Sequence, residues 1–250
     1  ENGEVLRRSI IWCDQRTGEE VEDMNRMLGA EKIIQITANP AVTGFTAAKI
    51  LWGKKHEPEL FARIRKIMLP KDYLVYCLTG VHATDYSDAS GMLLLDVEHK
   101  CWSRDMLALC GISESQMPRL YESFAPVGTL LPETAAALGL PQGVTVCAGA
   151  GDNAAAAVGT GTVSTGAAHA DSRCNISLGT SGTIFISSEK FGVDATNGLH
   201  AFAHADGGWH LMGCMLSAAS CNKWWQDAII GTNDYKGEEA KIAPEMLGRN

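Results

Sequence analysis

The strongest constraint on the fold is a region of small residues between positions 143 and 186. It holds many of the 26 glycines and two short β-type runs, residues 144–147 and 183–186, with almost no large side chains between them. Dense glycine beside strands indicates a backbone that comes close to another group, because no Cβ stands in the way. Helical patterns dominate the preceding half of the chain, so we predict an α/β protein.

Residues 144–159 predict a strand, a tight turn and an Ala-rich helix that begins at or just after Asp152. A helix start offers unpaired N–H groups and a partial positive charge, which hold an Asp ionised and fix its rotamer. Such an Asp can act as a general base toward a hydroxyl group. The alternative, commoner for such a segment taken alone, is that Asp152 is only the N-cap of this helix.

The second constellation is a turn of four residues between two β-type arms, residues 176–186. Its members are Gly179, Thr180, Ser181 and Gly182. Backbone N–H groups and hydroxyls in such a turn can converge on a phosphate without a lysine. The alternative is an ordinary hairpin closed by Gly and Ser. The turn matches neither a Walker A loop nor a dinucleotide fingerprint.

Helix start and stop signals recur along the first half of the chain. The predicted helices are residues 19–28 ended by Gly29, 46–52 ended by Gly53, 58–68, 70–79 ended by Gly80, 103–110 ended by Gly111, and 132–138 ended by Gly139. Residues 9–13 predict a strand that Asp14 and Arg16 follow. Residues 84–88 predict a polar loop, and the spacing of Leu211, Met215 and Trp224 predicts a buried helix over 209–225.

Composition excludes several classes of partner. The chain has 250 residues, 46% hydrophobic and 20% charged, with a formal net charge of −8 and no long basic stretch. Nucleic acid and anionic membranes are therefore not expected partners. No apolar run reaches membrane-spanning length without a charge or glycine, so we expect a cytoplasmic protein.

The cysteines and histidines do not form a metal or disulfide pattern. The eight cysteines include no C-x-x-C pair, so we predict reduced, mostly buried thiols. The seven histidines are scattered, and the closest group, His200, His204 and His210, has no Cys or carboxylate cluster beside it. We therefore predict no metal site on the chain.

Several segments, in order and over nearly the whole chain, resemble the FGGY carbohydrate kinases and, among them, the kinases of xylulose. These segments are residues 11–16, 44–52, 69–74, 87–90, 149–153, 177–182, 210–212 and 215–220. The resemblance implies the actin/hexokinase/Hsp70-like (ribonuclease H-like) kinase fold, with two α/β domains around a cleft. Residues 1–163 would then belong to the sugar-binding domain and residues 164–250 would begin the nucleotide-binding domain.

The resemblance also implies roles for individual residues. In that family the Asp of Gly-Asp-Asn is the base for the attacking hydroxyl, which assigns this role to Asp152 and a sugar contact to Asn153. Trp12 matches a position that lines the polyol site, and Phe45 is assigned to the same site. The turn from Gly179 to Gly182, with Thr180 and Ser181, is similar to the second phosphate loop. Asp14, Arg16 and Lys49 match neighbouring positions, and the alternatives are a local ion pair for Asp14 with Arg16 and a solvated side chain for Lys49.

The implied activity is ATP- and Mg²⁺-dependent phosphorylation of a ketopentose, D-xylulose to D-xylulose 5-phosphate, by an enzyme that could form a homodimer. Alternative substrates are ribulose, glycerol and gluconate. The family's amino-terminal Asp-x-Gly-Thr hairpin, its Met-His-Gly sugar motif and its late adenosine-binding segment have no counterpart here, and the chain begins with Glu1. We therefore expect a middle piece of a longer protein, inactive alone. A fragment that binds sugar without turnover and a non-catalytic regulator are the rival interpretations. The segment from 161 to 175 is also longer than the usual connector.

Overall fold

The computed structural model describes residues 3–164, 173–194 and 198–244. The chain divides into two compact units, Glu1–Asn175 with Phe185–Met212, and Ile176–Ile184 with Gly213–Asn250. The long connector expected between 161 and 175 lies mostly outside the described residues. The domain boundary after residue 163 stays a prediction.

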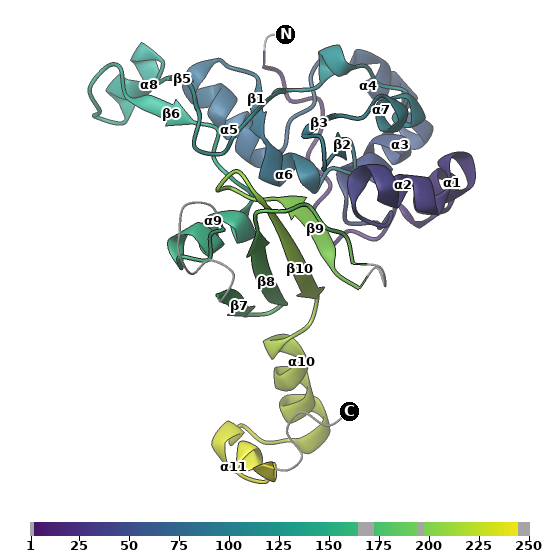
Figure 1. Cartoon of the computed structure of the whole chain (residues 1–250), viewed down its shortest axis with the longest axis vertical. Coiled ribbons are helices and arrows are strands. Elements are labelled where there is room, and N and C mark those ends of the chain that lie inside the picture. The colour runs from purple at the N-terminus through teal and green to yellow at the C-terminus, as the bar shows by residue number, and fades with distance from the viewer. Residues whose placement is uncertain (1–2, 165–172, 195–197, 245–250) are drawn as a thin grey trace. The chain divides into compact units, whose positions relative to one another are not determined.

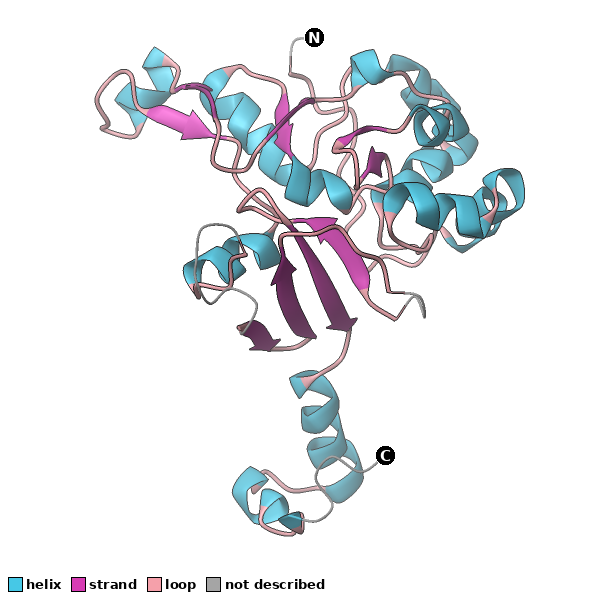
Figure 2. Cartoon of the chain, viewed as in Figure 1, coloured by secondary structure: helices cyan, strands magenta, loops and turns pink. Residues whose placement is uncertain are grey.

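The first unit is built mainly from short helices (Figures 1 and 2). They are α1 (Gly18–Leu28), α2 (Ala30–Thr37), α3 (Thr46–His56), α4 (Pro58–Arg63), α5 (Pro70–Thr79), α6 (Tyr86–Ser90), α7 (Arg104–Cys110), α8 (Pro132–Ala137) and α9 (Asp152–Gly159). Three small sheets accompany them. One pairs β1 (Ala83–Asp85) with β4 (Arg119–Tyr121) in parallel. The other two are antiparallel: β2 (Leu95–Asp96) pairs with β3 (Cys101–Trp102), and β5 (Pro126–Thr129) pairs with β6 (Thr145–Cys147).

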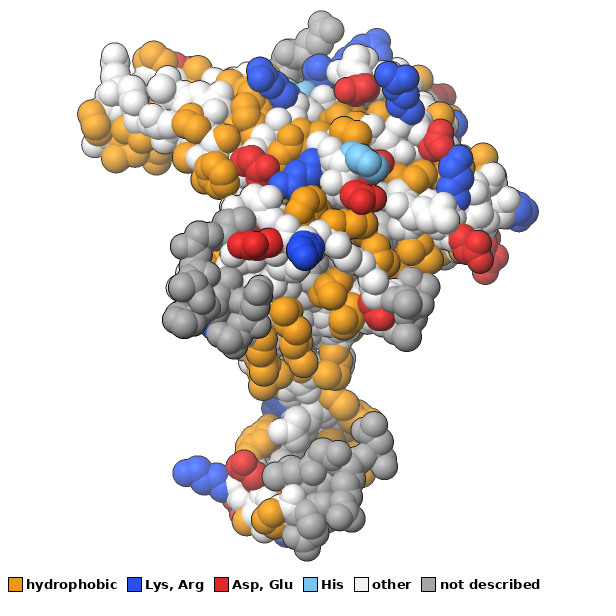
Figure 3. Space-filling view, in the orientation of Figure 1, with side chains coloured by type: hydrophobic (Ala, Val, Ile, Leu, Met, Phe, Trp, Pro, Cys, Tyr) orange, Lys and Arg blue, Asp and Glu red, His pale blue; other side chains and the backbone are white. Residues whose placement is uncertain are grey.

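A four-stranded sheet follows, with the strand order β7-β8-β10-β9. Its strands are β7 (Cys174–Leu178), β8 (Gly182–Ser188), β9 (His200–Ala203) and β10 (Trp209–Met215), and the division between the two units falls within β7, β8 and β10. The second unit continues with α10 (Ala219–Trp224), a π-helical turn (Trp225–Ile230) and α11 (Tyr235–Glu239). Large hydrophobic side chains are exposed on β7 and β8, among them Leu178, which is 75% exposed. Figure 3 shows hydrophobic side chains on the surface of the molecule.

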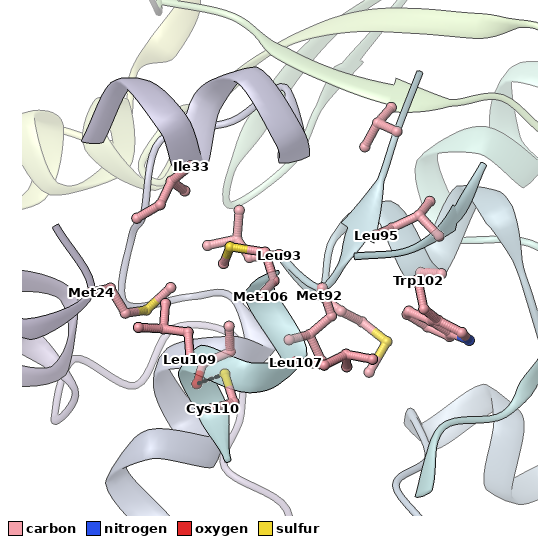
Figure 4. Close-up of a cluster of buried hydrophobic side chains, with 14 of the residues drawn as sticks. Met24, Ile33, Met92, Leu93, Leu95, Trp102, Met106, Leu107, Leu109 and Cys110 are labelled. Atoms are coloured by element: carbon pink, nitrogen blue, oxygen red, sulfur yellow. Dashed lines mark hydrogen bonds between the residues drawn. The ribbon is translucent and has the colours of Figure 1, made fainter. Parts of the chain in front are cut away.

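The core of the first unit lies between α1, α2, α3, α7 and the segment before β2 (Figure 4). Met24, Leu93 and Met106 are completely buried in it. The Trp102 indole packs at its edge and donates its N–H to the Pro118 carbonyl over 2.9 Å. Buried hydrophobic side chains of this size each contribute about 1.5–3 kcal/mol, so this cluster is the main source of stability of the helical layer.

Local signals placed several helix ends correctly. Gly29, Gly80 and Gly111 follow α1, α5 and α7 with φ angles of 93°, 73° and 71°, a region that favours glycine. Ser103 begins α7, because its hydroxyl accepts the N–H of Met106. The strands expected at 144–147 and 183–186 and the helix expected to begin near Asp152 are also present, as β6, β8 and α9.

Two expectations near the amino end were wrong. Residues 9–13 form no strand, and Trp12 is 58% exposed. A strand requires a hydrogen-bonded neighbour, and no strand in the described part of the chain pairs with this segment. Gly53 does not end α3, which continues to His56 and stops before Pro58. Proline disfavours the helical conformation in the residue before it, and Glu57 accordingly leaves the helical region.

Two further expectations failed because the segments have distant partners. Residues 84–88 are not a loop but the end of β1 and the start of α6, and Asp85 is completely buried. Residues 209–225 are not one buried helix but β10 followed by α10, and Trp224 is 56% exposed. Gly207 and Gly208 form the turn that pairs β10 with β9, a hairpin signal that the helical spacing obscured.

The cysteines were expected to be mostly buried, but only Cys110 is, so this prediction was wrong. Cys110 donates its thiol to the Ala47 carbonyl over 3.7 Å within the core, and burial raises the pKa of this thiol to about 12. The other seven cysteines lie at exposed positions. Among the described helices, none has the length and apolar character to cross a membrane.

Candidate active site

Asp152 is the first residue of α9, and its carboxylate is exposed. Gly151 occupies the N-cap position, so the interpretation of Asp152 as the N-cap itself does not hold. Its Oδ1 accepts the backbone N–H of Asn153 over 2.8 Å and the Asn153 amide over 3.1 Å. The carboxylate is thus oriented by the adjacent residue at the positive end of the helix, with its second oxygen available to a ligand.

The backbone that precedes Asp152, residues 148–151, is held by the turn between β4 and β5 and by side chains. We call this segment the 148–151 loop. The N–H groups of Ala148 and Gly149 donate to the carbonyls of Ala125 and Ser123, over 3.0 and 3.1 Å. The N–H of Gly151 donates to the Ser87 hydroxyl over 3.0 Å. The start of α9 is therefore fixed by contacts outside the helix.

An ionic cluster lies beside this loop, formed by one lysine and three aspartates. We call it the Lys71 cluster. The Lys71 ammonium lies 2.8 Å from Asp72, 3.0 Å from Asp85 and 3.9 Å from Asp88. Asp72 and Asp85 are completely buried. Burial lowers the pKa of Lys71, but the charges of Asp72 and Asp85 more than compensate and raise it, so the ammonium stays charged.

Asp88 is the member of the Lys71 cluster with the strongest perturbation. Burial raises its pKa to about 7, against the attraction of Lys71 and with the repulsion of Asp72, Asp85 and Asp152. Burial also raises the pKa of Asp72. One cation thus faces three carboxylates, and Asp88 is the one that binds a proton near neutral pH.

Trp12 and Phe45, the expected sugar-lining residues, lie in one part of the first unit. A Cβ on Gly44 would lie 3.0 Å from the Trp12 carbonyl oxygen, which shows how closely these segments approach. The Phe45 ring contacts His200 edge-on, with ring centroids 5.5 Å apart. Lys49 donates to the Gly44 carbonyl over 2.7 Å, and burial lowers its pKa. The expected roles of Trp12 and Phe45 remain predictions.

Asp14, Arg16 and Lys49 were expected near Trp12, each with a simpler alternative to a ligand role. Asp14 and Arg16 form a local ion pair, with 2.8 Å between Arg16 Nη2 and Asp14 Oδ2. The Arg16 guanidinium also lies over the Trp52 ring, 4.9 Å from its centroid. Lys49 is half-buried, so it is not a freely solvated side chain.

The turn from Gly179 to Gly182 belongs to the second unit. Its carbonyls accept hydrogen bonds from the residues before and at the start of α10: Ala219 N–H to Gly179 over 2.9 Å, and Ala218 N–H to Thr180 over 2.8 Å. A Cβ on Gly182 would lie 2.9 Å from the Ala218 Cβ, so only glycine fits there. The turn is therefore a fixed element, and Thr180 and Ser181 remain predicted phosphate ligands.

The histidines near the β9–β10 hairpin act as packing residues. His204 shares a hydrogen bond with the Thr162 carbonyl over 3.0 Å, and His210 stacks on Phe185 with centroids 4.0 Å apart. Burial lowers the pKa of His210 to about 3, so it is neutral. No group of three or more His, Cys, Asp or Glu residues in the described ranges is arranged to hold a metal ion.

Residues 1–159 match the N-terminal domain model of the FGGY family of carbohydrate kinases. The chain belongs to this family. It is 47% identical over 221 residues to the xylulose kinase of Escherichia coli K12, covering 88% of this chain and 44% of that relative. It is 40% identical over 248 residues to the xylulose kinase of Bacillus subtilis 168, covering 99% and 48%. The chain thus spans about half the length of the curated relatives it matches.

Solved structures of FGGY kinases confirm the fold class. The crystal structure of a xyloylose kinase from Brucella ovis aligns with a TM-score of 0.84 and 41% identity, over 92% of this chain and 46% of that one. Plasmodium falciparum glycerol kinase aligns with a TM-score of 0.83 at 21% identity, over 96% and 48%, which shows the shared fold alone. The chain therefore has the actin/hexokinase-like fold of sugar kinases, as the resemblance implied.

The Lys71 cluster and its serine partners were not predicted from the sequence, in which Asp85 and Asp88 were expected to lie in a polar loop. One local signal was present, because Asp is a preferred N-cap residue, and the Asp85 carboxylate accepts the backbone N–H of Ser87 at the start of α6. The pairing with Lys71 and Ser123 joins segments far apart in the sequence, and no local pattern contains it.

Proposed function

We propose that the protein containing this chain transfers the γ-phosphoryl group of ATP to a hydroxyl of a ketopentose. D-xylulose, converted to D-xylulose 5-phosphate, is the proposed substrate, since relatives that cover nearly all of this chain are named xylulose kinases. The structural observation that supports the proposal is the exposed, oriented carboxylate of Asp152 at the start of α9, within the matched family segment.

Asp152 is the proposed general base. Phosphoryl transfer needs positioned reactants, stabilised charge and a modest base, because little covalent chemistry falls to the protein. As the sugar oxygen forms its bond to the γ-phosphorus, its proton passes to the Asp152 carboxylate and ADP leaves. Asn153, whose amide and backbone N–H orient that carboxylate, is also the proposed sugar contact.

Sugar and phosphate ligands are proposed from the remaining assigned residues. Trp12 and Phe45 would line the apolar side of the sugar, and Thr180 and Ser181 would donate hydroxyl hydrogens to phosphate oxygens. Magnesium would arrive bound to the nucleotide phosphates, the usual mode of binding in phosphoryl transfer. No step of the reaction is assigned to an ion held by this chain.

The test is Asp152→Asn in the full-length protein, with Asp105→Asn as control. Asp105 is an exposed carboxylate paired with Lys32, outside the proposed site. Loss of the base should lower kcat by about 10²–10⁴-fold with little change in sugar affinity. The control should retain its activity. Unchanged turnover in Asp152→Asn removes the base assignment.

Substrate choice is tested separately with xylulose, ribulose, glycerol and gluconate in an assay that couples ADP release to absorbance. The highest kcat/KM is expected for xylulose, and a preference for another polyol would overturn that part of the proposal. The rival interpretation, sugar binding without turnover, applies to these 250 residues taken alone, since they span about half of the relatives. Calorimetry of this chain with xylulose and with ATP distinguishes the two: heat with sugar alone favours the rival.

A further inference from the structure

The 148–151 loop, which directly precedes Asp152, is hydrogen-bonded to side chains at both ends. At one end, the Lys71 ammonium donates to the Ala148 carbonyl over 3.1 Å. At the other end, the Ser87 hydroxyl accepts the Gly151 N–H over 3.0 Å. Asp152 is the next residue after Gly151, so its position follows directly from the second contact.

Asp85 contacts both Lys71 and Ser87, the two side chains that bind the loop. Its Oδ1 lies 3.0 Å from the Lys71 ammonium, and its Oδ2 accepts the hydroxyl of Ser87 over 2.5 Å and that of Ser123 over 2.7 Å. Because the Ser87 hydroxyl hydrogen is directed at Asp85, its lone pairs face the Gly151 N–H. The carboxylate of Asp85 is completely buried, and it therefore orients these donors without competition from water.

The loop sequence is adapted to this close approach. Gly149 has a φ of 80°, and a Cβ there would lie 3.1 Å from Lys71 Cδ. A Cβ on Gly151 would lie 3.6 Å from the Asp88 Cα, in ordinary contact. The positive φ therefore favours glycine at position 149, where a Cβ would also press on Lys71, while Gly151 packs on the backbone of α6.

We propose that Ser87, Asp85 and Lys71 are positioning residues, which fix the 148–151 loop so that the Asp152 carboxylate meets the attacking hydroxyl. The inference rests on the proposed function of Asp152. None of the three contacts the sugar or the nucleotide in this proposal. They act through the backbone of the loop, where a displacement of about 1 Å can cost catalysis up to about 10²-fold.

Ser87→Ala in the full-length protein removes the hydroxyl that accepts the Gly151 N–H, and it changes only one oxygen atom. We expect kcat to fall about tenfold and the sugar KM to stay within about twofold. Ser87→Thr keeps the hydroxyl and should restore most of kcat. Ser103→Ala is the matched control, because Ser103 is equally buried and also accepts a backbone N–H, that of Met106, but in α7. It should lower the melting temperature by a similar amount with unchanged kcat.

A double-mutant cycle separates positioning from general destabilisation. If Ser87 acts through Asp152, adding Ser87→Ala to Asp152→Asn should cost less than about twofold in kcat, because the group being positioned is already inactive. A tenfold loss in both backgrounds, or a loss matched by Ser103→Ala, overturns the inference. Should Ser87→Ala fail to fold, Ser123→Ala, which removes one donor to Asp85, takes its place with the same expected pattern. If Asp152→Asn alone leaves turnover unchanged, the proposed function fails instead, and the two failures are distinct.

Discussion

Asp88 offers a quantitative test of the Lys71 cluster. In the folded chain burial raises the pKa of Asp88 to about 7, whereas the ordinary value of this carboxyl is 3.8. The folded state therefore keeps a proton that the unfolded state releases between these two values. The sign follows: the contribution of Asp88 to stability is complete below about pH 4 and is lost as the pH rises through about 7.

The size of this effect follows from the two pKa values. At about 1.36 kcal/mol for each pH unit, the difference corresponds to about 4 kcal/mol of unfolding free energy. This is an upper bound, because the Asp88 side chain is 29% exposed and water screens part of its charge. Asp88→Asn is neutral at every pH, so its stability should be closest to that of wild type near pH 4 and should exceed it most above about pH 8.

The assay is thermal melting of the full-length protein from about pH 5 to about pH 9, with Asp105→Asn as control. The melting temperature of Asp88→Asn relative to wild type should rise from about pH 5 to about pH 7, most steeply between the two pKa values, and should level off above about pH 8. The control should follow the wild-type curve, since its carboxylate lies in a surface pair with Lys32. A pH-independent difference between Asp88→Asn and wild type would refute the assignment of a neutral Asp88.

Two more predictions concern packing and backbone geometry. Met106→Ala should lower the unfolding free energy by about 2–5 kcal/mol in denaturant titration, because the side chain is completely buried. Gly149→Ala should cost about 1–2 kcal/mol, since its φ of 80° and the nearby Lys71 exclude a Cβ, and it should also lower kcat if the loop positions the base. Gly53→Ala is the contrast, because Gly53 lies inside α3 with open space around it; it should stabilise the protein by about 0.5–1 kcal/mol. Equal effects of the two glycine substitutions would contradict the argument.

The parts of the fold that the sequence predicted correctly are those set by local chemistry. Gly29, Gly80 and Gly111 end helices because the chain there adopts a conformation that favours glycine, and this requirement is visible in a few residues. The start of α9 at Asp152 belongs to the same class. By contrast, β10 was mistaken for a helix because Leu211 and Met215 fit either period, and its partner β9 decides between them.

In the candidate site, too, features set by local sequence were predictable and features set by distant partners were not. The place of Asp152 after a strand and at a helix start was predictable, since the whole motif lies within a short segment. The burial of Asp85 was not predictable, because it depends on Lys71 and Ser123, which lie on other elements. A polar stretch looks like a loop until its partners are known.

The Lys71 cluster restricts which substitutions can be accepted at these positions during evolution. One ammonium group neutralises carboxylates that are buried or half-buried around it. Replacement of Lys71 by a neutral residue would leave these carboxylates unpaired in a low-dielectric interior, which would lower the unfolding free energy by several kcal/mol. Mutations here are therefore tolerated in concert, so lineages that have lost the lysine should also have exchanged at least one of the aspartates.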